Sequence, residues 1–269
     1  MDINNLRQYW EKRLSIISLD SVGYKGLGEK YNFWLYKIKK KQLQKCLNKY
    51  SISIKGKTVL DIGAGFGFYV DFWCSNGASE IVGLDIAKTA INFLKKIYPH
   101  YSFYCCDISD KVLPSELMNK KFDIISAFDV LYHIVDDVKF EMAIENISNL
   151  CKENAYFLLS DVFIEHGNII SSYYIKSRLL KDYEYILQNK GFKILGKIPV
   201  FHFMIPPVDI KNMVEDKIFN TLWSITSRFI NLNPNKVGKI AYILEVFLNF
   251  LSLRGTSTKI MICKKVNDK

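Results

Sequence analysis

The segment 58–73, TVLDIGAGFGFYVDFW, limits the possible folds more than any other part of this chain. It begins with an apolar run, continues with glycines at positions 63, 65 and 67, and ends in a helix-compatible stretch. Glycine accepts the positive φ angles of a tight turn, and its missing Cβ lets a ligand approach the backbone closely. The segment therefore predicts a strand, a turn and a helix at the entry to a nucleotide-binding α/β domain.

The spacing of the glycines and the acids near them narrow the type of nucleotide site. A dinucleotide fingerprint has the form G-x-G-x-x-G, whereas the spacing here is G-x-G-x-G. Asp61, two residues before the first glycine, would repel a pyrophosphate but would suit a cationic ligand head. Two later predicted strands, 80–85 and 101–107, end in Asp85 and Asp107. In Rossmann-type folds the acid after the second strand hydrogen-bonds the ribose hydroxyls.

These elements in this order resemble the class I S-adenosylmethionine-dependent methyltransferases, of the bacterial small-molecule type, over about residues 57–163. The resemblance implies S-adenosylmethionine as the cofactor. It also implies that Asp61 and the glycine loop face the methionine portion, that Asp85 holds the ribose diol, and that Asp107 and the backbone of Ile108 meet the adenine. The implied cofactor residues are Asp61, Gly63, Ala64, Gly65, Gly67, Asp85, Ile86, Asp107, Ile108 and Phe128.

The core alternates strand-like and helix-like runs, which is typical of a parallel sheet covered on both faces. We expect an α/β fold with a Rossmann-like seven-stranded sheet flanked by helices. The expected parts are an N-terminal helical lid segment (1–50), the core (51–201 and 257–269) and a helical insert (202–256) between strands six and seven. The expected strands are 58–63, 80–85, 101–107, 122–128, 155–161, 192–200 and 258–263, and the expected helices are 67–76, 87–97, 138–151, 173–189, 209–230 and 236–252.

Two segments outside the core raise separate questions. In the resembling family a segment before the first strand often covers the cofactor, which makes Tyr31 and Trp34 candidates for a lid; a role as ordinary core aromatics fits the same pattern. The insert has the apolar periodicity of two helices. It could close over the acceptor as a substrate cap, form a dimer contact, or sit on a membrane surface, and the sequence leaves these alternatives open.

Candidate catalytic residues follow the fourth and fifth predicted strands. Ligands of open α/β sheets bind at the carboxyl ends of the strands near the topological switch point, so the ends of strands one, four and five should line the site. His133 is the first candidate for a general base that takes a proton from a hydroxyl acceptor. The alternative for His133 is a structural role in its loop. His166 is the second candidate for the base.

Three further residues are candidates for contact with the ligands. Tyr132 and Phe128 could touch the cofactor or the acceptor, or could lie in the core. Arg178 could bind an acidic acceptor group with both ends of its guanidinium. A salt bridge on the surface of a helix is the alternative role for Arg178.

Composition excludes several other classes of protein. The net charge of +10 comes almost wholly from dispersed lysine, and the arginine-aromatic interleaving that grips single-stranded nucleic acid is missing, so nucleic acid is an unlikely partner. Six cysteines form no C-x-x-C pair and no zinc-type cluster, which favours a reducing, cytoplasmic setting. No cluster of ligands predicts a metal site, and assistance by magnesium stays open. The longest apolar stretch, 240–253, is too short to span a bilayer, although peripheral membrane contact remains open.

The leading functional hypothesis is O-methylation of a small molecule, a sugar or glycan, or a secondary metabolite, by a monomer or homodimer. The segment 128–131 lacks the Asn/Asp-Pro-Pro-aromatic pattern of enzymes that methylate exocyclic amines. One alternative is an RNA or protein methyltransferase that uses the lysine surface for docking. Another is a non-catalytic cofactor-binding module, and a nicotinamide dehydrogenase is disfavoured by the glycine spacing.

Overall fold

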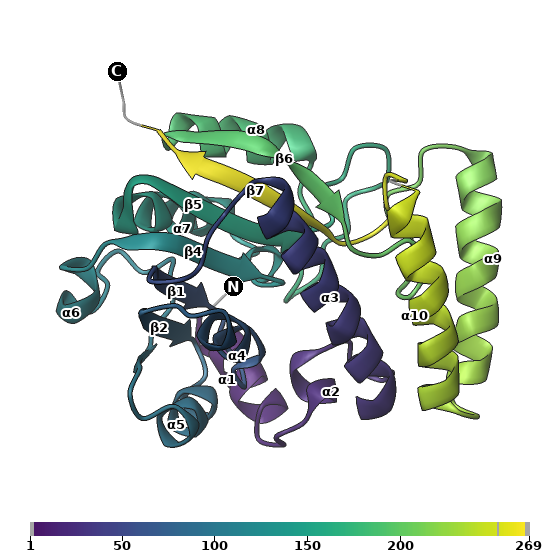
Figure 1. Ribbon diagram of the computed structural model, residues 1–269, viewed down its shortest axis with the longest axis horizontal. Coiled ribbons are helices and arrows are strands. Elements are labelled where there is room, and N and C mark those ends of the chain that lie inside the picture. The colour runs from purple at the N-terminus through teal and green to yellow at the C-terminus, as the bar shows by residue number, and fades with distance from the viewer. Residues whose placement is uncertain (1–2, 252, 267–269) are drawn as a thin grey trace.

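The computed structural model describes residues 3–251 and 253–266, and within them seven strands form a single sheet (Figure 1). The strand order is β3-β2-β1-β4-β5-β7-β6. The strands are β1 (Thr58–Ile62), β2 (Glu80–Asp85), β3 (Ser102–Cys105), β4 (Phe122–Phe128), β5 (Cys151–Asp161), β6 (Phe192–Pro199) and β7 (Lys259–Lys265).

The sheet is parallel from β3 to β5, and only β7 runs against its neighbours β5 and β6. The chain moves outward in one direction through β1, β2 and β3 and then crosses to β4 on the other side of β1. The topological switch point therefore lies between β1 and β4, where open α/β sheets bind their ligands. Both strands are apolar and buried, as strands covered on two faces must be. The predicted fold class is confirmed.

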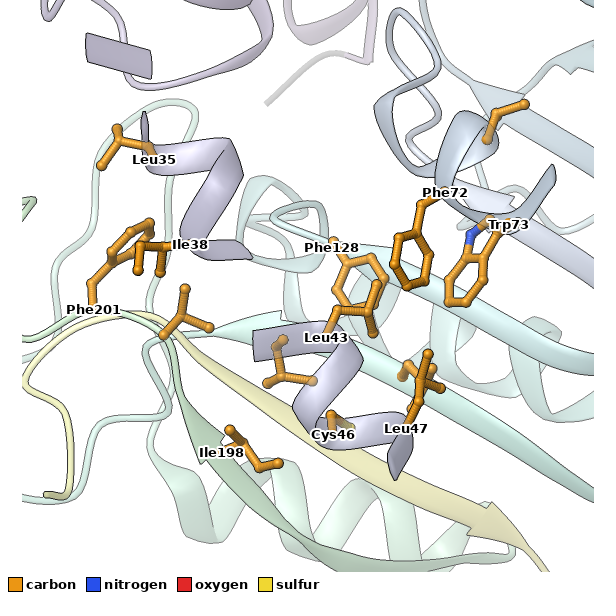
Figure 2. Close-up of a cluster of buried hydrophobic side chains, with 14 of the residues drawn as sticks. Leu35, Ile38, Leu43, Cys46, Leu47, Phe72, Trp73, Phe128, Ile198 and Phe201 are labelled. Carbon is orange, nitrogen blue, oxygen red and sulfur yellow. The ribbon is translucent and has the colours of Figure 1, made fainter. Parts of the chain in front are cut away.

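Helices cover both faces of the sheet and make two main cores. One core packs α3, α4 and the insert helices on one face, and the other packs α7 and α8 on the opposite face. Figure 2 shows the first core where α3 crosses the sheet, with Leu43 and Leu47 beside Phe72 and Phe128. The core helices are α4 (Phe68–Ser75), α5 (Lys88–Ile97), α6 (Ser115–Met118), α7 (Asp137–Leu150) and α8 (Leu180–Asn189), with a 3₁₀ turn at Leu131–His133.

The other helices lie in the N-terminal segment and in the insert. They are α1 (Ile3–Arg13), α2 (Leu19–Val22), α3 (Glu29–Lys49), α9 (Met213–Ile230) and α10 (Pro234–Phe250). The insert helices begin where side chains cap them: Asn212 accepts backbone N–H bonds of α9, and Asn233 does so for α10, which has a proline at its start. In Figure 1 α9 and α10 stand side by side at one end of the molecule, and α10 lies next to α3.

The expected helix at 173–189 is wrong in its first part, because α8 begins only at Leu180. The backbone before it makes long-range hydrogen bonds instead of helical ones. Lys176 N donates to the Tyr132 carbonyl, and Ile164 N donates to the Arg178 carbonyl. Apolar periodicity in this stretch therefore reflects packing of an irregular loop beside the end of β4, and tertiary bonds override the local pattern.

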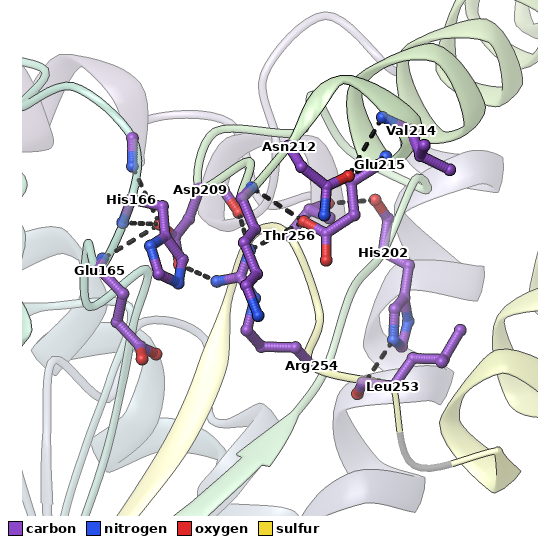
Figure 3. A network of polar contacts seen from close by, with 12 residues as sticks. Glu165, His166, His202, Asp209, Asn212, Val214, Glu215, Leu253, Arg254 and Thr256 are labelled. Carbon is purple, nitrogen blue, oxygen red and sulfur yellow. Dashed lines mark hydrogen bonds and ion pairs between the residues drawn. The ribbon is translucent and has the colours of Figure 1, made fainter.

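A polar network fixes the base of the insert to the core (Figure 3). Oδ1 of Asp209 accepts the backbone N–H groups of residues 165, 166 and 167. Oδ2 of Asp209 accepts hydrogen bonds from Arg254 and from Lys259, whose Nζ is 2.9 Å away. The buried carboxylate thus holds three segments together: the loop after β5, the start of the insert and the start of β7.

Candidate active site

A cavity of about 540 Å³ lies at the carboxyl ends of β1, β2, β3 and β4. Its volume is within the range of about 300–1,000 Å³ that is usual for small-molecule sites. The loops after these four strands form its floor and sides, and α1 and α2 add a further wall. Of the strand ends that the sequence analysis expects at the site, those of β1, β2, β3 and β4 contribute residues to the lining of this cavity, and that of β5 does not.

The glycine turn forms one side of the cavity. Gly63, Gly65 and Gly67 all have positive φ angles, of 70°, 51° and 86°. A Cβ at position 63 would lie 2.2 Å from Cγ2 of Val130, and one at position 67 would lie 2.8 Å from Cδ2 of Leu94. Both positions therefore require glycine for space as well as for conformation. The contact of Val130 with Gly63 places the loop after β4 directly against the glycine turn, so both segments line the cavity.

Asp85, the last residue of β2, holds the turn in place from below. Its Oδ2 accepts the N–H of Gly65 and its Oδ1 accepts the N–H of Ala87, each at 2.9 Å. Burial raises the pKa of Asp85 to about 6, although these two hydrogen bonds act in the opposite direction. Each carboxylate oxygen has a further lone pair for a ligand donor. Asp85 lines the cavity and can therefore meet a hydroxyl pair.

The end of β3 supplies a second acidic group. Oδ1 of Asp107 accepts both the N–H and the hydroxyl of Ser109, at 2.9 and 2.7 Å. Asp107 lines the cavity together with apolar side chains that can flank a flat ring. All the sequence-predicted cofactor residues except Asp61 lie in the cavity wall: Gly63, Ala64, Gly65, Gly67, Asp85, Ile86, Asp107, Ile108 and Phe128.

Asp61 lies beneath the glycine turn, outside the cavity wall. Its Oδ1 accepts the hydroxyl of Ser126 on the neighbouring strand β4, at 2.6 Å. Its Oδ2 is buried and has no hydrogen-bond partner within the described residues. Burial raises the pKa of Asp61 to about 7. The structure therefore places Asp61 under the turn, and Asp61 is not among the residues that line the cavity.

Helices α1 and α2 form the wall that sequence reasoning missed. Leu6, Trp10 and Leu14 lie four residues apart on one side of α1 and line the cavity. The spacing of these apolar residues was a readable signal for a buried helix face. Two ties hold the pair in place. Glu11 accepts hydrogen bonds from Thr89 at the start of α5, and Arg13 donates to the Ser21 carbonyl of α2.

The two lid candidates of the sequence lie elsewhere, between α3 and the insert. Tyr31 is fully buried, and its hydroxyl donates to the Met204 carbonyl at 2.8 Å. The indole of Trp34 donates to Oδ1 of Asn235 at 2.9 Å and packs on Gly238 of α10. Neither residue lines the cavity, so the contacts match the alternative of core aromatics.

His133 lines the cavity at the end of the 3₁₀ turn after β4. Its Nδ1 is 2.6 Å from the Tyr174 carbonyl oxygen. A carbonyl only accepts, so Nδ1 carries the hydrogen and the neutral ring keeps a lone pair on Nε2. The ring packs edge-on against Trp10 at 4.8 Å. Burial lowers the pKa of His133 to about 4, so the ring is neutral near pH 7.

An ion pair beside His133 was also missed from the sequence. Nζ of Lys39, on α3, is 2.7 Å from Oδ2 of Asp129, which lines the cavity. Asp129 has a φ angle of 59°, a conformation that is uncommon for a residue other than glycine, and its Oδ1 accepts the hydroxyl of Ser160. The phenols of Tyr36 and Tyr69 line the cavity beside this pair, and burial raises the pKa of both.

Three other predicted ligand contacts lie outside the cavity wall. Tyr132 stacks obliquely on His133, with ring centres 4.3 Å apart. The backbone N–H of His166 donates to Asp209 in the network of Figure 3. Arg178 is buried, donates to Asp137 and to the Ile134 carbonyl, and lies 3.8 Å above the ring of Phe140. Arg178 therefore forms a salt bridge, but from a buried loop and not from the surface of a helix.

Two further classes of feature are missing from the part of the chain that the structure describes. Residues 3–251 and 253–266 contain no group of three or more His, Cys, Asp or Glu side chains that could hold a metal ion. In the same residues no helix combines the length and the apolar character needed to cross a bilayer.

Comparison with known proteins supports the interpretation of the site. A family model described as a methyltransferase domain matches residues 53–191, just over half of the chain. A mitochondrial ubiquinone biosynthesis O-methyltransferase of Dictyostelium discoideum is 32% identical over 108 residues, 38% of this chain and 31% of that protein. The ribosomal protein L11 methyltransferase of Staphylococcus haemolyticus is 28% identical over 141 residues, 51% of this chain and 38% of that protein. Both matches span less than half of the relative's own length.

Among solved structures, the N-methyltransferase NodS from Bradyrhizobium japonicum WM9, in complex with S-adenosyl-l-homocysteine, resembles this fold with a TM-score of 0.57. The likeness covers 98% of this chain and 100% of NodS at 12% identity, so it concerns the fold alone. The family model is the stronger finding, because the residues it matches include the glycine turn, Asp85, Asp107 and His133. The chain therefore belongs to the methyltransferase-domain family, within the class I fold of enzymes that use S-adenosylmethionine.

Proposed function

We propose that this protein transfers a methyl group from S-adenosylmethionine to a hydroxyl of a small, largely apolar molecule. The observation that carries the proposal is that one cavity joins the glycine turn and Asp85 to His133. The first two features suit a nucleoside with a ribose diol. His133 adds a neutral imidazole to the wall of the same cavity.

The residues in the cavity wall fit the cofactor. The side-chain-free turn at 63–67 leaves room for a ligand against the backbone, and Asp85 and Asp107 present carboxylate oxygens to hydroxyl and amino groups. Ile86 and Ile108 give apolar contact for a flat base. S-adenosylmethionine, when bound, supplies a methyl group on a positively charged sulfur that is activated for transfer. The protein's own contribution is then to position the acceptor and to exclude water.

His133 is the group that we propose takes the acceptor's proton. The hydrogen bond from Nδ1 to the Tyr174 carbonyl fixes the ring so that Nε2 is the free acceptor. A pKa of about 4 keeps the ring neutral near pH 7 but makes it a weak base. A weak base is better matched to a phenol, with a pKa of about 10, than to the far less acidic hydroxyl of a sugar. We therefore favour a phenolic acceptor over a glycan.

The walls near His133 support an apolar acceptor. Trp10 of α1 packs on the ring of His133, and Val130 and Tyr173 also line the cavity. The ion pair Lys39–Asp129 and the phenols beside it provide polar groups that can orient one end of such a molecule. A few fixed polar groups in an otherwise apolar wall are typical of sites for small molecules.

Cofactor binding is the first test of the proposal. Calorimetric titration with S-adenosylmethionine and S-adenosylhomocysteine should show saturable binding to the wild type. Asp85→Asn removes one carboxylate oxygen and should weaken binding about tenfold or more, equivalent to about 1.4 kcal/mol. Asp216→Asn, an exposed change on α9, is the matched control and should bind as the wild type does. Equal binding by Asp85→Asn, or no binding by the wild type, would contradict the assigned site.

Turnover with a panel of acceptors is the second test. Phenols and catechols should be methylated faster than sugars or free amines, as followed by mass spectrometry of the products. A macromolecular acceptor is the competing outcome, because a relative is named a ribosomal protein methyltransferase and the chain carries a net charge of +10. That outcome would appear as activity on protein or RNA that falls steeply with added salt.

A further inference from the structure

The insert helices α9 and α10 expose apolar side chains on their outer faces. On α10 the exposed apolar residues Ile240, Ile243, Leu244 and Phe247 fall on one side of the helix and form a stripe, which Leu251 continues directly after the helix end. On α9 a similar stripe consists of Val214, Ile218, Ile225 and Phe229. The exposed fractions are high, for example 61% for Ile240 and 55% for Phe247.

The inner face of α10 is more polar than its outer face, which reverses the usual pattern of a surface helix. The residues buried on the inside are Gly238, Ala241, Glu245 and Asn249. Single exposed apolar residues are normal, but apolar stripes of this kind mark surfaces that bind a partner. No residue of α9 or α10 lines the cavity, so ligand binding in the cavity does not account for the two exposed stripes.

The polar inner face also fixes the orientation of α10. Glu245 accepts the backbone N–H groups of His202 and Met204, and Asn249 donates to the Val200 carbonyl. A Cβ at Gly238 would lie 2.4 Å from Cδ1 of Trp34, so α10 meets α3 closely at this point. Rotation of the helix would leave the buried Glu245 and the three backbone groups without partners. The apolar stripe is thus held outward by the fold.

The charges around the stripes are almost all positive. Glu215 is paired with Arg254, which leaves Asp216 as the one exposed acid among the described residues of the two helices. The exposed cations of the insert helices are Lys217, Arg228, Lys236 and Lys239. On the neighbouring helix α3, Lys37 is exposed as well, and its Nζ lies over the ring of Tyr242 on α10.

We propose that the outer face of α9 and α10 binds the surface of an anionic membrane. Apolar side chains such as Ile243 and Phe247 enter the boundary between headgroups and acyl chains, and the flanking lysines meet anionic headgroups. The charge favours this occupant over a second copy of the chain, because two such faces would bring like charges together. The proposal rests on the geometry of the insert alone and does not depend on the proposed methyl transfer.

Vesicle co-sedimentation tests the proposal with the full chain. The wild type should bind vesicles of phosphatidylcholine mixed with phosphatidylglycerol, and binding should fall when phosphatidylglycerol is left out. The double variant Ile243→Ser/Phe247→Ser should lower the partition constant about tenfold or more, because one buried apolar side chain contributes at least about a factor of ten. Lys236→Glu/Lys239→Glu should weaken binding to the anionic vesicles only.

The control is Val112→Ser/Val138→Ser, which removes two even more exposed apolar side chains outside the insert and should bind vesicles as the wild type does. The exposed positions should leave the thermal midpoint and S-adenosylmethionine affinity unchanged in every variant, which separates this test from that of the cofactor site. Equal binding by Ile243→Ser/Phe247→Ser, or equal binding to neutral vesicles, would overturn the proposal. The proposal would also be overturned if light scattering showed that the wild type is a dimer and Ile243→Ser/Phe247→Ser a monomer, because the stripes would then bind a second copy of the chain.

Discussion

Two buried carboxylates, Asp61 below the glycine turn and Asp209 at the base of the insert, have opposite surroundings. Asp209 accepts three backbone N–H groups and two cationic side chains. Asp61 accepts one hydroxyl, from Ser126, and its Oδ2 has no partner within the described residues. Burial acts on both, but it raises the pKa of Asp61 to about 7, whereas Lys259 and the N–H groups hold the pKa of Asp209 below its ordinary value.

The two carboxylates show two kinds of buried polar site in one protein: one whose hydrogen bonds are all made, and one with an oxygen that lacks a partner in the described part of the chain. Fully satisfied buried charges make a rigid anchor, because any movement costs several bonds at once. Buried polar atoms without partners are costly in stability and are concentrated where a protein does chemistry. We therefore expect changes at the insert anchor to alter stability and leave turnover alone. Changes around the cavity should alter turnover and leave stability nearly unchanged.

The largest expected effect is on turnover, at His133. His133→Asn removes the proposed base and should lower kcat by about 10²–10⁴, the usual contribution of general acid–base catalysis. S-adenosylmethionine affinity and the thermal midpoint should stay close to wild type, and His100→Asn, at an exposed site, is the matched control. If kcat and the thermal midpoint of His133→Asn fall together, His133 supports its loop and the base lies elsewhere.

Stability should respond most strongly at Asp209. Asp209→Asn leaves the buried Lys259 without its carboxylate, and breaking a buried pair in this way costs about 3–5 kcal/mol. Urea unfolding should therefore show a large loss of unfolding free energy, while cofactor affinity of the folded protein is unchanged. Asp182→Asn on α8 is a suitable control, because its side chain enters no ion pair within the described residues. A weakened cofactor affinity would show that the anchor and the cavity are coupled.

The glycine-turn side of the cavity could be predicted from the sequence because its signals are local. The glycines at 63, 65 and 67 and the acids Asp85 and Asp107 follow directly after apolar strands, and strand order places the strand ends at one edge. Asp61 belongs to the same motif, yet its side chain lies below the turn. The motif thus predicts an acid at position 61, and only the structure shows that this acid contacts the hydroxyl of Ser126.

The rest of the cavity, around His133, was harder to predict because its residues meet across long sequence distances. Lys39 reaches Asp129 from α3, and no local pattern links these two positions. The wall formed by Leu6, Trp10 and Leu14 depends on where α1 docks, which the hydrogen bonds of Glu11 to α5 decide. The inward Glu245 likewise reverses the usual inside and outside of α10, which a hydrophobic pattern alone cannot indicate.

A smaller effect is expected at the wall of the cavity. Trp10→Ala opens the space beside His133 to water and removes an apolar contact for the acceptor. The KM for the acceptor should rise about tenfold, in line with the burial of a large apolar side chain. Tyr185→Ala, which removes an exposed aromatic ring from α8, should not change KM. A change in cofactor affinity without a change in acceptor KM would place Trp10 over the cofactor end.

The last effect is a difference in pH dependence between the two buried carboxylates. Asp209 has a lowered pKa, so its contribution to stability is present above about pH 4 and is lost as the pH falls through the folded-state pKa. Asp61 has a raised pKa, so its contribution is present below about pH 4 and is lost as the pH rises toward 7. One such group changes the unfolding free energy by at most about 1.4 kcal/mol per pH unit.

Urea unfolding between about pH 4 and pH 7 can isolate this slope, because Asp61→Asn stays neutral throughout. The slope should become flatter by up to about 1 kcal/mol per pH unit in Asp61→Asn and stay unchanged in the exposed control Asp216→Asn. S-adenosylmethionine should change the slope only if ligand binding gives the unpaired Oδ2 of Asp61 a partner. The buried indole N–H of Trp73 lies close enough to Asp61 to lower its pKa. An unchanged slope in Asp61→Asn would mean that this N–H or a water already satisfies the oxygen, and the contrast with Asp209 would then be one of degree.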